Sequence, residues 1–316
     1  MPPATRMHVV HGYDHVPHEA RGATLAIGNF DGVHRGHQAL FEAARAVVSG
    51  HGGLAGAMVF EPHPREFFQP DKPHFRLTTL PQKIALVERY GLDLAVVLTF
   101  DRNLAGLTAR AFIERVLVAG LGVRHVIVGH DFHFGKGRDG NTQVMLEMAK
   151  ELGFEVTVVE TVAEAGEVFS SSAIRAEIAQ GDVKSAADIL GHAWRVGGKV
   201  IGGAKRGTGL GYPTANIAMP KGTALAHGIY AVFVHVHGER HEGAAYLGTR
   251  PTFDAGTPIL ETFLFDFDGD LYGREIEVEF IDYIRGDRRF ETIDALKAQM
   301  DKDCARARTI LGRAHG

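Results

Sequence analysis

The sequence GNFDGVHRGH, residues 28–37, joins an apolar run at 24–27 to a segment with helical apolar spacing at 38–48. This order predicts a strand, a glycine-containing turn and a helix. Glycines let a backbone approach a ligand closely, and a helix N-terminus presents free N–H groups to an anion. His34 and His37 can hydrogen-bond a phosphate oxygen and, when cationic, also neutralise it. The segment therefore predicts a nucleotide-binding turn.

The first part of the chain alternates strand and helix patterns around this turn. Apolar, β-rich runs lie at 24–27, 54–60, 94–100, 123–128 and 154–160. Helical patterns lie at 38–48, 81–90, 108–119, 142–152, 172–180 and 183–190. Repeated βα units predict a parallel sheet covered by helices on both faces. Ligands of such sheets bind at the carboxyl ends of the strands, which is where the turn lies. The histidines at positions 8, 11, 15 and 18 fall in a polar lead-in and are expected to be solvated.

The pattern changes near Gly191, where glycine becomes dense and helical spacing disappears. Strands are predicted at 194–200, 230–236, 243–247, 259–265 and 276–283, followed by a helix at 293–311. Short strands with frequent turn signals are typical of an antiparallel barrel or sandwich. We expect a domain boundary within 184–192, which divides the chain into domains 1–187 and 188–316.

Composition excludes several classes of protein. The chain has 316 residues, of which 45% are hydrophobic, and a net charge of −4. No run of lysine or arginine predicts a nucleic-acid footprint, and no apolar run reaches the about 18 residues of a membrane span. The single cysteine, Cys304, excludes an intrachain disulfide and a multi-cysteine metal site. A cytoplasmic protein without nucleic-acid or membrane partners is expected.

Two further segments are expected beside the first turn. GHDFHFG, residues 129–135, follows the fourth predicted strand, and SSSAIR, residues 170–175, follows the fifth. Arg175 could bind a triphosphate bidentately, although helix capping alone would explain one serine. The presence of Phe132 and Phe134 is explained equally well by core packing and by contact with a ligand. Glu61-Pro62-His63-Pro64 is interpreted as a rigid turn at the rim of the pocket.

The second half carries a different glycine-rich segment, GTGLGYPTAN, at residues 207–216. Three glycines at alternate positions exclude a regular buried strand, and Lys205 and Arg206 add positive charge. The spacing is not that of a Walker A loop. A plain glycine-rich hairpin is the alternative.

The first set of motifs resembles the nucleotidylyltransferase superfamily, and the ten-residue form GNFDGVHRGH resembles bacterial FAD synthetases in particular. The resemblance implies adenylyl transfer in which His34 and His37 are catalytic. It implies nucleotide binding by Gly28, Asn29, Phe30, Asp31, His34, His37, Ser171, Ser172 and Arg175. It implies flavin binding by Asp131, Phe132 and Phe134. Phe169 and Ser172 replace the usual isoleucine and threonine of the third motif, and both changes keep the physical role.

The second set resembles the G-x-L-G-x-P-T-A-N signature of riboflavin kinases. The resemblance implies nucleotide binding by Lys205, Gly207, Gly209, Gly211, Thr214 and Asn216. It implies Mg²⁺ binding by Thr214 and Asn216, and a general base at Glu261, which would otherwise be interpreted as an outward strand residue. Thr262 and Phe263 follow Glu261 where the family usually has valine and histidine. Tyr246 and Leu247 replace the common asparagine–isoleucine pair. The acids Asp266, Asp268 and Asp270 are interpreted as turn residues.

Both motif sets occur in the order of bifunctional riboflavin kinase/FAD synthetases. The resemblance implies a Rossmann-like α/β nucleotidylyltransferase domain, then a mostly-β antiparallel barrel with a C-terminal helix. It implies that riboflavin is phosphorylated to FMN and that FMN is adenylylated to FAD, with ATP and Mg²⁺ in both steps. Three alternatives remain: a monofunctional enzyme with one decayed site, a flavin-binding regulator without turnover, and a nucleotidylyltransferase for another small molecule. The sequence leaves a homo-oligomer open.

Overall fold

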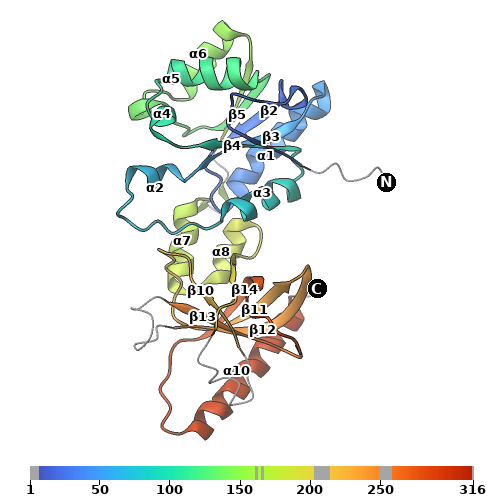
Figure 1. Cartoon of the computed structure of the whole chain (residues 1–316), viewed down its shortest axis with the longest axis vertical. Coiled ribbons are helices and arrows are strands. Elements are labelled where there is room, and N and C mark those ends of the chain that lie inside the picture. The colour runs from blue at the N-terminus through green and yellow to red at the C-terminus, as the bar shows by residue number, and fades with distance from the viewer. Residues whose placement is uncertain (1–6, 161–162, 165–166, 203–213, 249–257, 315–316) are drawn as a thin grey trace. The chain divides into compact units, whose positions relative to one another are not determined.

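The computed structural model describes residues 7–160, 163–164, 167–202, 214–248 and 258–314. The chain forms two compact units, coloured from blue to red along the chain in Figure 1. Unit 1 comprises Met1–His74 and Thr78–Ser170, and unit 2 comprises Phe75–Leu77 and Ser171–Gly316. Helices α7 (Ser171–Gln180) and α8 (Val183–Leu190) fall in unit 2 because their apolar faces are buried in its core. The functional division into domains 1–187 and 188–316 stays a prediction.

Unit 1 contains a six-stranded sheet in which every neighbouring pair is parallel, in the order β1-β4-β3-β2-β5-β6. The strands are β1 (His8–His11), β2 (Thr24–Ile27), β3 (Ala55–Glu61), β4 (Leu94–Thr99), β5 (His125–Gly129) and β6 (Glu155–Val159). The predicted parallel sheet is therefore confirmed. The interpretation of the N-terminal histidines as a polar lead-in is wrong for His8 and His11, because they flank Val9 and Val10 in a strand that pairs with β4.

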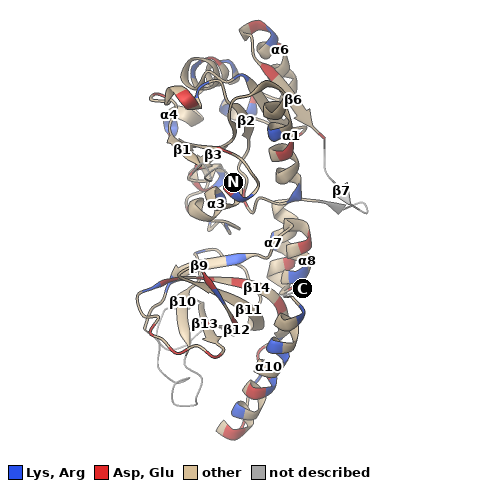
Figure 2. Ribbon diagram, turned by 90° about the vertical axis from the view of Figure 1, so that its right-hand side faces the viewer, with Lys and Arg blue, Asp and Glu red and all other residues tan. Residues whose placement is uncertain are grey.

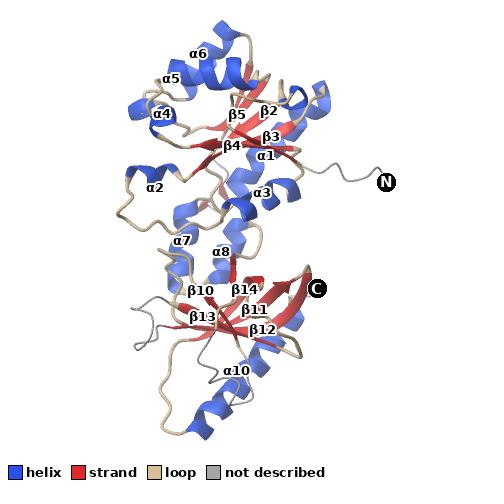
Figure 3. Ribbon diagram, in the orientation of Figure 1, coloured by secondary structure: helices blue, strands red, loops and turns tan. Residues whose placement is uncertain are grey.

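Helices cover both faces of this sheet, as Figure 3 shows. One face packs against α1 (Arg35–His51) and α3 (Leu80–Arg89). The other packs against α5 (Ala109–Phe112), the π-helical segment η2 (Ile113–Leu121) and α6 (Thr142–Leu152). Neighbouring residues of β2 bury their side chains on opposite faces, Leu25 and Ile27 on one and Ala26 on the other. The sequence missed the short helices α2 (Pro64–Phe68) and α4 (Arg102–Ala105), the 3-10 turns η1 (His18–Ala20) and η3 (Lys136–Arg138), and the β-pair β7 (Ala163–Glu164) and β8 (Glu167–Val168).

Unit 2 contains a six-stranded antiparallel sheet in the order β10-β13-β12-β11-β14-β9. The strands are β9 (Arg195–Lys199), β10 (Ala215–Ala218), β11 (Gly228–Val236), β12 (Glu239–Gly248), β13 (Ile259–Leu264) and β14 (Glu275–Arg285). A bridge between Ile201 and Asn216 brings the two edges together, so the sheet is a nearly closed barrel. This confirms the barrel prediction, although the sequence missed β10, which begins at the last two residues of the glycine-rich 207–216 segment.

The two faces of this barrel have different partners. Along β11, Tyr230, Val232 and Val234 face the interior core, to which α7 and α8 also contribute. The alternate residues Ala231 and Phe233 face the last helix, α10 (Ile293–Arg313), through its buried Ala307 and Leu311. Acidic and basic residues are interspersed along α10, which Figure 2 shows. The predicted C-terminal helix is therefore confirmed.

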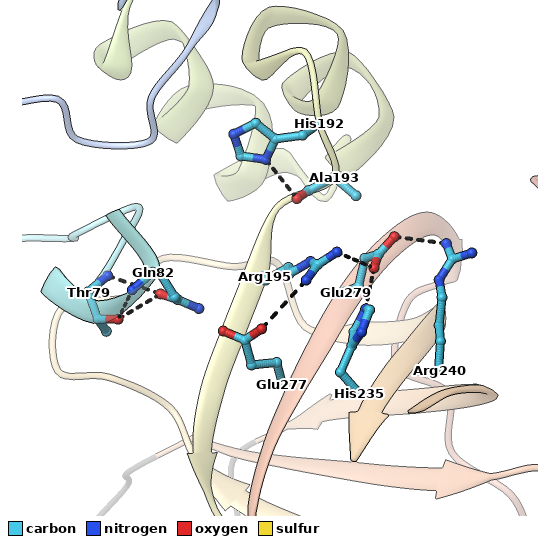
Figure 4. Close-up of polar contacts among 9 residues, drawn as sticks. All are labelled: Thr79, Gln82, His192, Ala193, Arg195, His235, Arg240, Glu277 and Glu279. Carbon is cyan, nitrogen blue, oxygen red and sulfur yellow. Dashed lines mark hydrogen bonds and ion pairs between the residues drawn. The ribbon is translucent and has the colours of Figure 1, made fainter. Parts of the chain in front are cut away.

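A buried carboxylate links its own strand, β14, to three other strands of the barrel (Figure 4). Glu279 on β14 accepts a hydrogen bond from Arg240 at 2.9 Å, pairs with Arg195 at 2.9 Å, and contacts His235. Burial acts to raise the pKa of Glu279, but the hydrogen bond with His235 and the charges of Arg195 and Arg240 outweigh it and lower the pKa to about 2. The carboxylate therefore stabilises the fold in its ionised form.

We predict that Glu279→Gln makes the free energy of unfolding of unit 2 less dependent on pH in the acid range. The folded pKa lies below the unfolded value of about 4.3. The stabilisation, roughly 3 kcal/mol, is thus fully present above that value and is lost as the pH falls toward 2. The only tryptophan, Trp194, is buried against Phe280 and reports unfolding by its fluorescence. Urea titrations at neutral and acid pH should show a large difference between wild type and variant at pH 7 and a small one near pH 2.

The exposed Glu275 on the same strand provides the control, because Glu275→Gln removes one carboxylate without touching the cluster. If Glu279→Gln and Glu275→Gln followed the same pH profile, the cluster would contribute nothing specific to stability.

Candidate active sites

The 28–37 turn leaves the carboxyl end of β2, which lies between β3 and β5 in the sheet. The chain runs from β2 towards β3 on one side, and only later reaches β5 on the other side. Open α/β sheets bind ligands at such a reversal of strand order. β5 ends at Gly129, so the 129–135 segment leaves the adjacent strand at the same edge. The fold thus brings the first two predicted motifs together.

The backbone of this turn is strained and tightly held. Phe30 and Val33 have φ angles of 48° and 47°, and both are fully buried. A β-branched residue is rarely found in this left-handed region, and such strain persists only where the surroundings enforce it. A Cβ atom at Gly28 would lie 2.9 Å from the Phe30 ring, so the glycine makes room for that ring.

The two motif histidines lie together at the start of α1. His34 is the residue before the first turn, and its ring stacks on that of His37 with centroids 3.6 Å apart. A Cβ atom at Gly36 would lie 3.1 Å from the His34 ring. Both Nδ1 atoms are buried and have no hydrogen-bond partner among the described residues. In the part of the chain that the structure describes, no side chain caps α1, and the first turn of this helix holds no acidic residue. This arrangement offers unsatisfied polar groups to an anion.

Both histidines are uncharged at neutral pH. Burial lowers the pKa of His34 to about 4, although Asp31 opposes the effect. Burial lowers the pKa of His37 well below its usual value, and repulsion from the protonated form of His34 and from Lys83 lowers it further. The cationic form considered from the sequence is therefore not the form present at pH 7. These imidazoles can bind a phosphate through hydrogen bonds, and the positive charge must come from other groups.

Sequence reasoning missed Thr78 and Lys83, which fix the conformation of this turn by hydrogen bonds. The Thr78 N–H donates to Asp31 at 3.1 Å, and the Gly32 N–H donates to the Thr78 hydroxyl at 3.0 Å. The Lys83 ammonium donates to the Asn29 carbonyl at 2.6 Å. Lys83 is 54 residues from Asn29 in the sequence. No local pattern connects the two, so only the packed fold identifies them.

The segment predicted to bind flavin has both a buried and an accessible part. Phe134 is 8% exposed and packs against Phe112 in the core, which favours the packing alternative for that residue. Phe132 stacks on Phe134 and is partly exposed, and Asp131 is exposed. Their predicted contact with flavin stays a prediction.

A second group of aromatic rings lies where β3 and β4 end. Phe60, Phe67 and Phe68 contact the ring of Phe100, and Phe68 is 63% exposed. The Glu61–Pro64 segment leads into α2, because His63 accepts a hydrogen bond from the Arg65 N–H at 3.1 Å. This predicted turn therefore presents an exposed phenylalanine at the carboxyl edge of the sheet.

The third predicted motif of the first site lies in unit 2 from Ser171 onward. Ser171 and Ser172 begin α7, and Ser172 is exposed. Arg175 donates to the Phe75 carbonyl at 2.6 Å and to the Ser171 carbonyl at 3.0 Å. The guanidinium thus joins residues 75–77 to α7. Because His34 and His37 belong to unit 1, joint action of these residues on one triphosphate stays a prediction.

Three residues form a row across one face of the barrel. Glu261 on β13 lies opposite Asn216 on β10 and opposite Tyr246 on β12. Directly opposed side chains of neighbouring strands lie on the same face and within contact distance. Asn216 is 3% exposed and donates to the Thr214 carbonyl at 3.4 Å. The fold thus brings Thr214, Asn216 and Glu261 together, as the second prediction requires. Lys205, Gly207, Gly209 and Gly211 lie outside the described residues.

The departures from the family pattern have different structural positions. A Cβ atom at Gly248 would lie 2.1 Å from the Tyr246 hydroxyl, so this phenol ring occupies the space over the glycine. Burial raises the pKa of Tyr246 to about 12, and Asp287 and Glu261 act in the same direction, which keeps the phenol protonated. Thr262 points instead to the interior, where its buried hydroxyl has no partner among the described residues. Tyr246 therefore adds a hydroxyl beside Glu261, whereas Thr262 does not.

Comparison with known proteins divides the chain in the same order. The family model for FAD synthetase matches residues 16–173, and the model for riboflavin kinase matches residues 190–311. The bifunctional riboflavin kinase/FMN adenylyltransferase of Escherichia coli K12 is 39% identical over 96% of both chains. The enzyme of that name from Pseudomonas fluorescens is 39% identical over 96% of this chain and 98% of its own. The one from Bacillus subtilis is 35% identical over 94% and 95%.

A solved structure shares the fold over nearly the whole chain. A protein from Streptococcus pneumoniae described as a macrolide-efflux protein is 27% identical, with a TM-score of 0.82 over 93% of this chain and 97% of its own.

Within the described ranges, this chain contains no helix with the length and apolar character of a membrane span.

Proposed function

Since the chain belongs to the bifunctional riboflavin kinase/FMN adenylyltransferase family, and so phosphorylates riboflavin and adenylylates FMN with ATP, we propose that the two steps use two separate sites. Adenylyl transfer takes place at the 28–37 turn, and phosphorylation takes place at the face that carries Asn216 and Glu261. The observation that supports this most strongly is the pair of stacked histidines, whose buried Nδ1 atoms lack partners among the described residues at an uncapped helix N-terminus.

In the first site, an FMN phosphate oxygen attacks the α-phosphorus of ATP. The bond to the β-phosphate oxygen breaks and pyrophosphate leaves. Such a reaction needs alignment of two anions and stabilisation of the negative charge that develops on the phosphate oxygens. His34 and His37 supply uncharged N–H donors, and α1 supplies its free backbone N–H groups. Ser171, Ser172 and Arg175 are proposed to hold the outer phosphates, and no protein nucleophile is required.

The flavin ring of FMN needs an apolar surface beside this turn. Phe132 and the exposed Phe68 offer aromatic faces at the carboxyl ends of β5 and β3. Asp131 is proposed to contribute a polar contact at the same edge. Aromatic side chains suit a planar ligand because they bury a large area at low conformational cost.

In the second site, the Glu261 carboxylate accepts the proton of the riboflavin 5′-hydroxyl while that oxygen attacks the γ-phosphorus of ATP. ADP leaves and FMN forms. General-base action requires a carboxylate within hydrogen-bond reach of the hydroxyl. Asn216, directly opposite Glu261, is proposed to hold the phosphates together with Thr214. Nucleotide binding by Lys205, Gly207, Gly209 and Gly211 is proposed on the resemblance alone.

The oxygen donors of this face fit Mg²⁺. Thr214 offers a hydroxyl and Asn216 a carbonyl oxygen, and Mg²⁺ binds through few protein oxygens together with substrate phosphates. The described residues contain no cluster of three or more His, Cys, Asp or Glu that could hold a metal ion. The phosphates of ATP would therefore complete the coordination. When bound, the ion would neutralise phosphate charge.

Chromatography of flavin products tests the proposal. The purified chain incubated with riboflavin, ATP and Mg²⁺ should form FMN first and FAD later, and with FMN in place of riboflavin it should form FAD directly. Flavin binding without ATP consumption would instead identify a regulator, and one missing product would identify a decayed site. A cytoplasmic location and a homo-oligomer stay predictions.

A further inference from the structure

The first site needs a positive charge that its histidines do not provide. His34 and His37 are uncharged at neutral pH, as described above. The proposed reaction nevertheless brings the phosphates of ATP and FMN together. Stabilisation of developing negative charge is usually the largest single contribution in such sites. The cation that supplies it should be fixed, close to the turn and shielded from water.

Lys83 has these properties. Its side chain lies in the first turn of α3 and is only 4% exposed. Its ammonium donates to the Asn29 carbonyl at 2.6 Å, inside the turn, and its charge acts on His37. Burying an ammonium group destabilises the folded state unless hydrogen bonds or opposite charges compensate for its lost hydration. Among the other cations, Arg35 at the start of α1 is exposed, and Arg175, proposed to hold the outer phosphates, belongs to unit 2.

The start of α3 is itself held firmly. Thr79 and Gln82 form a reciprocal capping box, drawn at one side of Figure 4. The preceding residue, Thr78, bonds to both Asp31 and Gly32. Lys83 therefore extends from a rigid base. The turn is hydrogen-bonded at Asn29 to Lys83 of α3, and at Asp31 and Gly32 to Thr78, just before α3.

We propose that Lys83 is a positioning residue of the adenylylation site, which fixes the phosphate-binding turn at Asn29 and supplies the fixed positive charge behind His37. This inference rests on the proposed function of the turn. The titratable and charged groups around the two histidines have opposite effects. Asp31 favours a proton on His34, whereas Lys83 and His34 disfavour a proton on His37. Arg35 adds an exposed charge from α1. Lys83 thereby also keeps His37 in its uncharged form.

The test compares Lys83→Met, Lys83→Gln and Lys83→Arg in the full chain. Methionine removes the charge at similar volume, glutamine keeps a donor without charge, and arginine keeps the charge. We expect the Met and Gln variants to lower kcat for FMN adenylylation at least about tenfold, with a smaller change in KM for ATP and unchanged riboflavin phosphorylation. Arginine should restore much of the rate. Lys150→Met, on the exposed surface of α6, is the matched control.

A second measurement does not depend on turnover. The ring-proton NMR signal of His37, assigned by its loss in His37→Ala, should titrate at higher pH in Lys83→Gln than in wild type. Arginine should return it to the wild-type value. Wild-type adenylylation by Lys83→Gln, or an unchanged His37 titration in that variant, would overturn the proposal. A different result would be normal adenylylation by His37→Ala together with the expected rise of the His37 pKa in Lys83→Gln. The proposed function of the 28–37 turn would then be wrong, whereas the effect of the Lys83 charge on His37 would stand.

Discussion

His37→Ala is expected to lower FMN adenylylation at least about a hundredfold and to leave riboflavin phosphorylation at its wild-type rate. The imidazole stacks on His34, makes a T-shaped contact with the Phe30 ring, and has a buried Nδ1 atom for which the described residues offer no hydrogen-bond partner. A single well-aimed donor in a site of this kind stabilises the transition state by about 3 kcal/mol. Because the group is uncharged at pH 7, its loss removes a hydrogen bond rather than an ion pair. The effect should therefore depend little on salt.

Separate assays of the two steps measure this result, with circular dichroism as the check on folding. His51→Ala is the matched control, since it makes the same substitution at the exposed end of the same helix. Near-normal FAD production by a folded His37→Ala protein would show that His37 is not required for adenylylation and would contradict the assignment of the reaction to this turn. A fall in both activities would show that the two steps do not use separate sites.

The architecture could be predicted from the sequence because its elements carry strong local patterns. The helix at 142–152 and the strand at 24–27 were predicted to the residue. β1 was missed because its two valines are flanked by histidines, and only pairing with β4 makes this short segment a strand. β10 was missed because it directly follows the glycine-rich segment. In both cases a tertiary partner outweighed a weak local preference.

The candidate sites could be predicted only in part. The motif residues themselves were identified, since each motif is contiguous in the sequence. Their support was not, because Thr78 and Lys83 reach the turn across 46 and 54 residues. The charge state of His37 also escaped prediction, since it follows from burial and from the nearby Lys83. Long-range contacts and protonation states that depend on packing can therefore be identified only from the folded structure.

Glu261→Gln should lower riboflavin phosphorylation at least about a hundredfold, because glutamine keeps the shape of the side chain but cannot accept the hydroxyl proton. Asn216 and Tyr246 flank Glu261 on neighbouring strands, and we expect the substitution to leave this register unchanged. KM for ATP should change little, since the proposed phosphate contacts come from other residues. FMN adenylylation should be unchanged because the residues proposed for that step include neither Glu261 nor its neighbours Asn216 and Tyr246.

Product formation from riboflavin and from FMN, measured in parallel on the same preparation, separates these effects. Glu239→Gln is the matched control, as that side chain is 81% exposed at the far end of β12. Wild-type phosphorylation by Glu261→Gln would return Glu261 to the alternative of an outward strand residue without a catalytic role. Loss of adenylylation along with phosphorylation would mean that one change on the barrel reaches the 28–37 turn. Retention of adenylylation alone, with Trp194 fluorescence unchanged, is the result that two independent sites require.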